Sequence, residues 1–152
     1  MSFRRGVRLG VDVGSVRIGV ARCDPDGILA TPVGTVPRGD GDLQQLAQLA
    51  REHEAVEIVV GLPVTLKGER GPAAEAATDF ATSLSRLVDA PVRMVDERLS
   101  TAAAQRGLHA AGRDTRSSRS MIDQAAAVLI VQSAVDFEKS TGEPAGRMVR
   151  TA

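Results

Sequence analysis

The order of its apolar runs constrains this chain more than any other feature. Three runs typical of β-strands follow one another at residues 7–13, 17–23 and 28–36, and an Asp26-Gly27 turn signal separates the last two. The rest of the chain alternates between helical spacing and short apolar runs. The elements expected there are a helix over 42–54, a strand over 56–60, a helix from Pro72 to before Pro91, a strand over 92–95, and helices capped by Ser100 and Ser120.

This order predicts an α/β fold with a mixed five-stranded sheet flanked by helices. Short turns connect the first three strands, so neighbouring strands there should run antiparallel. Two strands connected by a crossover helix instead favour parallel pairing. The first, fourth and fifth strands should accordingly run parallel. Pro32 cannot donate a hydrogen bond to a neighbouring strand, so the third strand should lie at an edge of the sheet. We expect one domain over 1–138 and a flexible tail over 139–152.

Composition excludes several classes of function. Nineteen basic and nineteen acidic residues cancel, which argues against a polybasic arm, and the single Cys23 excludes an intrachain disulfide and a cysteine zinc site. Trp and Tyr are absent, so aromatic stacking on single strands is disfavoured, and nucleic acid would be held through phosphate. The sequence has neither an apolar run of about 18 residues nor a signal-peptide core, which predicts a cytoplasmic protein with no membrane partner.

Asp12 is the most informative single residue, because it interrupts an apolar run that should form the central strand. A buried, ionised carboxylate without a partner is costly, so Asp12 requires a cation or a ring of backbone N–H groups. The cation could be a metal ion or an arginine such as Arg17. The second possibility would give Asp12 a purely structural role.

Two further acids fall at comparable places. Glu97 follows the strand over 92–95, at the sheet edge where ligands bind in open α/β folds, although it could also be a solvated acid at a helix start. Asp123 lies three residues after Ser120, where it could instead complete a capping box. Together the three carboxylates offer the hard oxygen ligands that Mg²⁺ prefers in phosphodiester-hydrolysing sites.

Four segments of the sequence resemble the YqgF family, also called RuvX. They are LGVDVGSVRIGVA at 9–21, VVGLP at 59–63, DERLST at 96–101 and IDQAAAVLI at 122–130. The resemblance implies an RNase H-like fold and a nuclease that matures the 5′ end of the 16S ribosomal RNA precursor or, in some members, resolves Holliday junctions. It also implies that Asp12, Glu97 and Asp123 are catalytic acids that bind Mg²⁺ or Mn²⁺.

The sequence departs from related resolvases at one position of this site. Those enzymes commonly carry an acid on the fourth strand, where this chain has Val59, Val60 and Gly61. Glu97 would have to substitute from the neighbouring strand. The number of metal ions, one or two, stays open.

Basic residues are the candidates for contact with nucleic acid. Four arginines precede Asp123 with only Asp114 to offset them, and three more basic residues accompany the acidic motifs. The first group could be a merely solvated surface, and members of the second could form structural ion pairs. The predicted phosphate contacts are Arg106, Arg113, Arg116 and Arg119 in the first group and Arg17, Lys67 and Arg98 in the second.

The leading hypothesis is a metal-dependent endonuclease acting on a four-way DNA junction or precursor ribosomal RNA. The near two-fold symmetry of a junction would suit a homodimer. A catalytically silent nucleic-acid-binding module is the alternative. The hairpin at 12–15 also looks like the phosphate-binding hairpin of actin-like nucleotide-binding proteins, but those proteins close two domains over a nucleotide and this chain supplies one.

Overall fold

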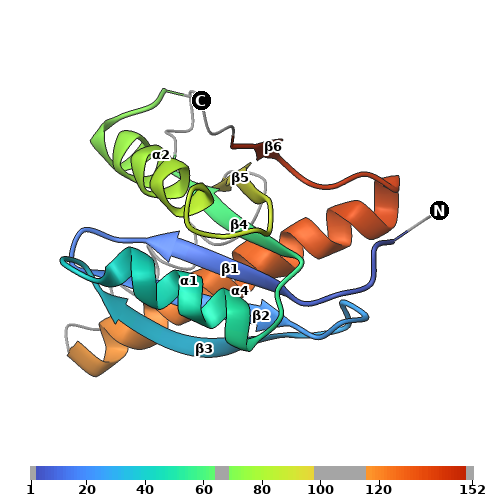
Figure 1. The fold of residues 1–152 in the computed structure, drawn as a ribbon, viewed down its shortest axis with the longest axis horizontal. Coiled ribbons are helices and arrows are strands. Elements are labelled where there is room, and N and C mark those ends of the chain that lie inside the picture. Colours follow the sequence, from blue (N-terminus) through green and yellow to red (C-terminus); the bar gives the residue numbers. More distant parts are fainter. Residues whose placement is uncertain (1–2, 64–68, 98–115, 150–152) are drawn as a thin grey trace.

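A computed structural model describes residues 3–63, 69–97 and 116–149, with the side chains of 116–122 outside the description. The described residues form one six-stranded sheet in the order β3-β2-β1-β4-β5-β6 (Figure 1). The strands are β1 (Arg8–Val13), β2 (Arg17–Cys23), β3 (Ala30–Pro37), β4 (Glu57–Leu62), β5 (Val92–Asp96) and β6 (Arg147–Met148). The helices are α1 (Asp42–Glu52), α2 (Pro72–Ser85) and α4 (Arg116–Thr141).

The pairing of the strands confirms the predicted α/β topology. β2 pairs antiparallel with β1 and with β3, whereas β4 pairs parallel with β1 and with β5. β3 lies at the edge of the sheet, as Pro32 predicted. Pro32 lies opposite Ala21, next to an irregularity in the β2–β3 register at Val20 and Ala21.

The count of five strands and the loose tail from residue 139 are both corrected by the structure. α4 continues to Thr141, and β6 then pairs antiparallel with β5. The Arg93 side chain donates to the carbonyl oxygens of Ala145 and Gly146 at 2.8 and 3.0 Å. These contacts join segments about 50 residues apart, so no local sequence pattern could reveal them.

The predicted start of the last helix is also wrong. α4 begins at Arg116, so Ser120 and Asp123 lie inside the helix and do not form a capping box at its start. A serine caps a helix only where the residues before it leave the helical conformation, and here they continue it. The helix expected after Ser100 lies outside the described residues.

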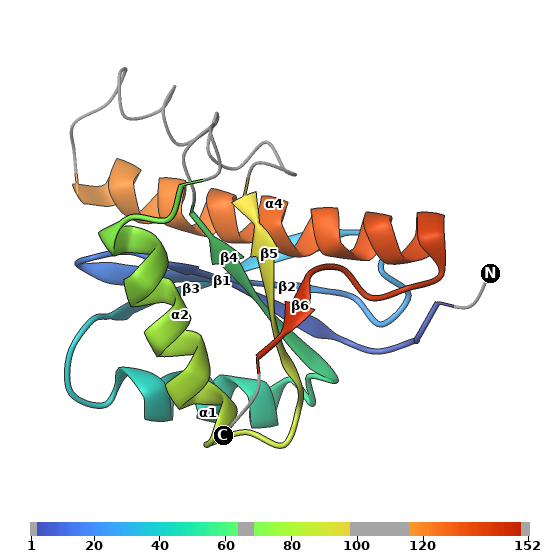
Figure 2. The ribbon, with the colours of Figure 1, turned by 90° about the horizontal axis from the view of Figure 1, so that it is seen from above.

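Helices cover the sheet in two layers. α1 and α2 lie on one face and α4 on the other (Figure 2). The first face buries large aliphatic side chains, among them Leu9, Val11 and Leu46. The α4 face uses small residues, because a Cβ atom added at Gly10 would lie 2.5 Å from the Ala127 carbonyl oxygen of α4. This face therefore lets the α4 backbone lie close to the strands.

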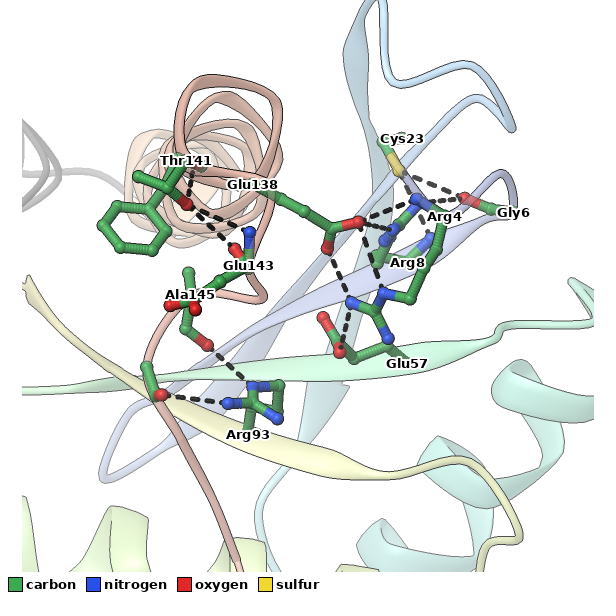
Figure 3. A network of polar contacts seen from close by, with 12 residues as sticks. Arg4, Gly6, Arg8, Cys23, Glu57, Arg93, Glu138, Thr141, Glu143 and Ala145 are labelled. Atoms are coloured by element: carbon green, nitrogen blue, oxygen red, sulfur yellow. Dashed lines mark hydrogen bonds and ion pairs between the residues drawn. The ribbon is translucent and has the colours of Figure 1, made fainter. Parts of the chain in front are cut away.

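A network of charged side chains closes the end of the sheet where β1 and β4 begin (Figure 3). Arg8 is only 1% exposed and donates to Glu138 of α4 at 3.0 Å. Arg4 donates to Glu138 at 2.6 Å and to Glu57 of β4 at 2.9 Å. The N-terminal segment, two strands and α4 are thus joined at one point.

In the parts of the chain that the structure describes, no helix is long and apolar enough to cross a bilayer.

Candidate active site

Asp12 lies on the α4 face of β1 and is only 5% exposed. Its place follows from two glycines, because it is two residues from Gly10 and pairs directly with Gly19 of β2. A Cβ atom at either glycine would run into the α4 backbone. Alternate residues of a strand, and residues directly opposite each other, share a face. The Asp12 carboxylate is therefore held between the central strand and the helix.

Asp123 of α4 lies directly over Gly19, the residue that pairs with Asp12. The Asp123 carbonyl carbon and oxygen occupy the space that a Gly19 side chain would need, and the Asp123 Cβ is 3.0 Å from that position. The Asp123 carboxylate also accepts a hydrogen bond from Arg17 Nε at 2.9 Å. Sequence alone offered Arg17 as one of several possible partners of Asp12, and the structure pairs its guanidinium with Asp123.

Glu97 follows β5 and reaches across β4 toward the central strand. It is 3% exposed, and its Oε1 atom lies 2.7 Å from the position that a Cβ of Gly61 would take. That same position is 2.6 Å from Ile130 Cδ1 of α4, so Glu97 lies on the α4 face. Gly61 directly follows Val60, which pairs with Val11 of β1. The missing acid on β4 is therefore matched by a glycine that leaves room for a carboxylate from β5.

The three acids thus share one face of the sheet and one end of it. They come from β1, from the residue after β5, and from a point about two turns into α4. The carboxyl ends of parallel strands β1, β4 and β5 meet here, which is the edge where open α/β sheets bind their ligands.

The donor set suits a hard divalent cation by its chemistry. Among the residues described, which include all three acids, no three or more His, Cys, Asp or Glu side chains form a cluster that could hold a metal ion. Mg²⁺ does not require one, because it uses one or two carboxylates and completes its shell with water or phosphate oxygens. Asp12, Glu97 and Asp123 therefore suit Mg²⁺ or Mn²⁺ by the chemistry of their carboxylate oxygens, with one or two of them on each ion.

The predicted nucleic-acid contacts are only partly placed. Arg17 lies at the site through its ion pair with Asp123. Lys67, Arg98, Arg106 and Arg113 lie outside the described residues. Arg116 and Arg119 belong to the first turn or so of α4, where the backbone alone is described. An arginine-rich approach to the acids stays a prediction from the sequence.

Sequence reasoning missed how glycines bring the acids together. Gly10, Gly19 and Gly61 each lie inside an apolar strand, and glycine there often marks a close approach of another backbone. That signal was present in the sequence, but it does not identify the approaching partner. The Arg17–Asp123 ion pair joins residues 106 positions apart and has no sequence signal at all.

The fold and the site together define a class of protein. A mixed sheet of this strand order, with acids from β1, the β5 end and the last helix on one face, is the arrangement expected of an RNase H-like nuclease. The sequence profile of the RuvX family, described as Holliday junction resolvase, matches residues 6–137. The chain belongs to the RuvX family and is a nuclease by that membership.

Relatives of known sequence support this membership over nearly the whole chain. A Streptomyces avermitilis protein is 52% identical over 152 residues, covering 98% of this chain and 97% of its own length. A Rhodococcus opacus protein is 56% identical over 149 residues, covering 93% and 83%. Both carry the name "Putative pre-16S rRNA nuclease".

A solved structure supports the fold independently. The RuvC protein of T. thermophilus, determined in complex with a Holliday junction substrate, superimposes with a TM-score of 0.59 over 94% of this chain and 99% of its own. The two sequences are 13% identical, so this likeness bears on the fold alone.

Proposed function

We propose that this nuclease is a divalent-metal-dependent endonuclease, in which Asp12, Glu97 and Asp123 hold Mg²⁺ or Mn²⁺. The observation that carries the proposal is the gathering of three carboxylates from β1, the β5 end and α4 on one sheet face, over Gly19 and Gly61. A bound divalent ion supplies Lewis-acid polarisation of the phosphate and makes water more acidic. Hydrolysis would leave a 3′-hydroxyl and a 5′-phosphate.

In this reaction the protein's own side chains position the acids and balance their charge. Asp12 is fixed on a central strand between two neighbours, and Glu97 is confined above Gly61. Arg17 neutralises Asp123 and brings a planar donor fork to the site, which suits a phosphate oxygen. Buried or half-buried groups held in this way need little rearrangement to receive substrate.

Structured nucleic acid is the proposed substrate class. The names of the relatives point to precursor 16S ribosomal RNA, and the RuvC structure points to a four-way DNA junction. We propose that Lys67, Arg98, Arg106, Arg113, Arg116 and Arg119 contact the phosphates of either one. Resolution of a junction would require a homodimer with two sites facing opposed strands. We propose that the enzyme acts in the cytoplasm, as either substrate would require.

The test compares acid variants with a matched control. Asp12→Asn, Glu97→Gln and Asp123→Asn remove one charge each, and Asp136→Asn makes the same change at an exposed position of α4. A labelled four-way junction and a 16S precursor fragment are incubated with Mg²⁺, with Mn²⁺, or with chelator. Cleavage should require the metal, fall by about 100-fold or more in the three site variants, and persist in Asp136→Asn.

The products separate the candidate functions. Symmetric nicks in the junction would identify a resolvase acting as a dimer, and cleavage of the precursor alone would identify an RNA-processing enzyme. A folded Asp12→Asn protein that cleaves as fast as the wild type would falsify the proposal. Binding without any cleavage would favour the catalytically silent module.

A further inference from the structure

The turn between β1 and β2 connects two parts of the proposed active site. It comprises residues 14–16 and joins the strand that carries Asp12 to Arg17, the partner of Asp123. The Gly14 amide donates to the Arg17 carbonyl oxygen at 3.0 Å and closes the turn. Val16 projects from it with 68% of its surface exposed. A turn so open to solvent needs support from elsewhere to keep a fixed position.

Arg38, which directly follows β3, supplies that support to two of the three carbonyl groups of the turn, those of Gly14 and Val16. Its backbone N–H donates to the Val16 carbonyl oxygen at 2.9 Å. Its side-chain Nη1 donates to the Gly14 carbonyl oxygen, also at 2.9 Å. One residue therefore holds the turn at its first and last positions.

The Arg38 side chain is itself held from the side of α1 and α2. Its Nε donates to Asp42 Oδ2 at 3.3 Å, and its guanidinium carbon lies 5.5 Å from the centre of the Phe80 ring. Asp42 also accepts the backbone N–H groups of Gly39 and Leu43 at 3.1 and 2.7 Å. The turn is thereby connected through Arg38 to the beginning of α1 and to the α2 layer.

We propose that Arg38 is a positioning residue for this nuclease, holding the β1–β2 turn so that Asp12 and Arg17 keep their places. The inference rests on the proposed function. Among the residues that the structure describes, Arg38 is linked to the site through Gly14 and Val16, so it differs from the basic residues assigned to phosphate. The Arg38 side chain is 30% exposed and that of Asp42 is 12% exposed, so the pair also contributes to stability, and the experiment has to separate this contribution from positioning. Small displacements of catalytic groups can cost about 100-fold in rate.

The experiment uses Arg38→Gln and Arg38→Lys in the full chain, with Arg5→Gln as the control. Arg5 also forms an ion pair, with Asp26, but it precedes β1 whereas the turn follows that strand, and its side chain is 71% exposed. Lysine keeps the charge but lacks the fork that binds Gly14 and Asp42 together. The rate of amide hydrogen exchange at Gly14 measures local opening of the turn, and the rate in β4 measures opening of the core. Cleavage is measured well below the melting temperature.

The expected result is faster exchange at Gly14 by about 10-fold in both Arg38 variants, with exchange in β4 unchanged. The kcat should fall by about 10-fold while KM stays within about 2-fold, and lysine should not restore it. Unchanged exchange at Gly14 would overturn the proposal. So would a raised KM with normal kcat, which would mean direct phosphate contact, or a uniform rise in exchange, which would mean general stabilisation only.

Failure of the proposed function would look different. A wild-type protein that cleaves neither substrate would contradict the proposal that this site is a nuclease site. The exchange measurement needs no substrate, so it would still decide whether Arg38 holds the turn.

Discussion

At the scale of single residues, the pairing of Gly61 with Glu97 explains how a site can exist without an acid on β4. The Glu97 carboxylate fills space that any side chain at position 61 would take, since its Oε1 atom lies 2.7 Å from the position of such a Cβ. The absence of a side chain at residue 61 therefore makes room for the Glu97 carboxylate. The acid that follows β5 and the glycine on β4 therefore form one structural unit.

Gly61→Ala should disturb this unit directly. The new methyl group would meet Glu97 Oε1 and, at 2.6 Å, Ile130 Cδ1, and contacts this short force neighbouring atoms to move. We expect a loss of about 1–3 kcal/mol in unfolding free energy and a fall in cleavage of about 10-fold or more. Denaturant unfolding and cleavage assays check both values.

Gly71→Ala is the matched control, because a Cβ at Gly71 would meet no atom of the described residues within 4 Å. It should leave cleavage unchanged. Full activity in a folded Gly61→Ala protein would show that Glu97 does not need its present position.

At the scale of elements, the site depends on how closely α4 lies against β1 and β2. Gly10 and Gly19 face the helix, and at both positions a side chain would strike the α4 backbone. Helix and strands can therefore approach closely enough for Asp123 to lie over the Asp12–Gly19 pair. The contact between these elements, and not a local motif, brings the two acids to the same place.

Gly19→Ala should push α4 away from the sheet. The obstacle is the Asp123 main-chain carbonyl, which cannot rotate aside as a flexible side chain could. We expect a loss of unfolding free energy of about 2 kcal/mol or more, together with loss of cleavage, because Asp123 must shift with its backbone. Gly71→Ala serves again as the comparison. Wild-type stability in Gly19→Ala would mean that α4 can lie farther from β2 without cost.

At the scale of the whole molecule, the two ends of the sheet carry different groups of charged residues. The three candidate acids lie at the end of the sheet where β1, β4 and β5 have their carboxyl ends, and the opposite end carries the network of Arg4, Arg8, Glu57 and Glu138 (Figure 3). Burial opposes the ionisation of Glu138, but hydrogen bonds from Arg4 and the charges of Arg8 and Arg4 outweigh it. The pKa of Glu138 therefore lies below its ordinary value of 4.5.

This shift predicts how stability depends on pH. A carboxyl group with a lowered pKa in the folded state contributes stability that is fully present above its unfolded pKa and is lost as pH falls through its folded pKa. Glu138→Gln leaves Arg8 buried without its anion, so it should cost about 3 kcal/mol at pH 7. As pH falls below about 4.5, the unfolding free energies of the variant and the wild type should approach each other, because Glu138 becomes protonated in the wild type.

Chemical unfolding across the pH range measures this convergence. Asp136→Asn, an exposed change on the same helix, should keep the wild-type profile. A difference between Glu138→Gln and wild type that stayed constant down to pH 2 would contradict the assigned role of the Glu138 charge.

The sequence by itself determined the first five strands and the edge position of β3, and it supplied the three acids as a prediction. These follow from local causes: apolar periodicity, the missing N–H of Pro32, and the cost of an acid such as Asp12 inside an apolar run.

Only the tertiary structure decided the sixth strand, the start of α4, the partner of Arg17 and the place of Glu97 above Gly61. Each of these depends on contacts between residues far apart in the chain. Such contacts form only after the sheet has been assembled, and no periodicity or spacing within one segment encodes them.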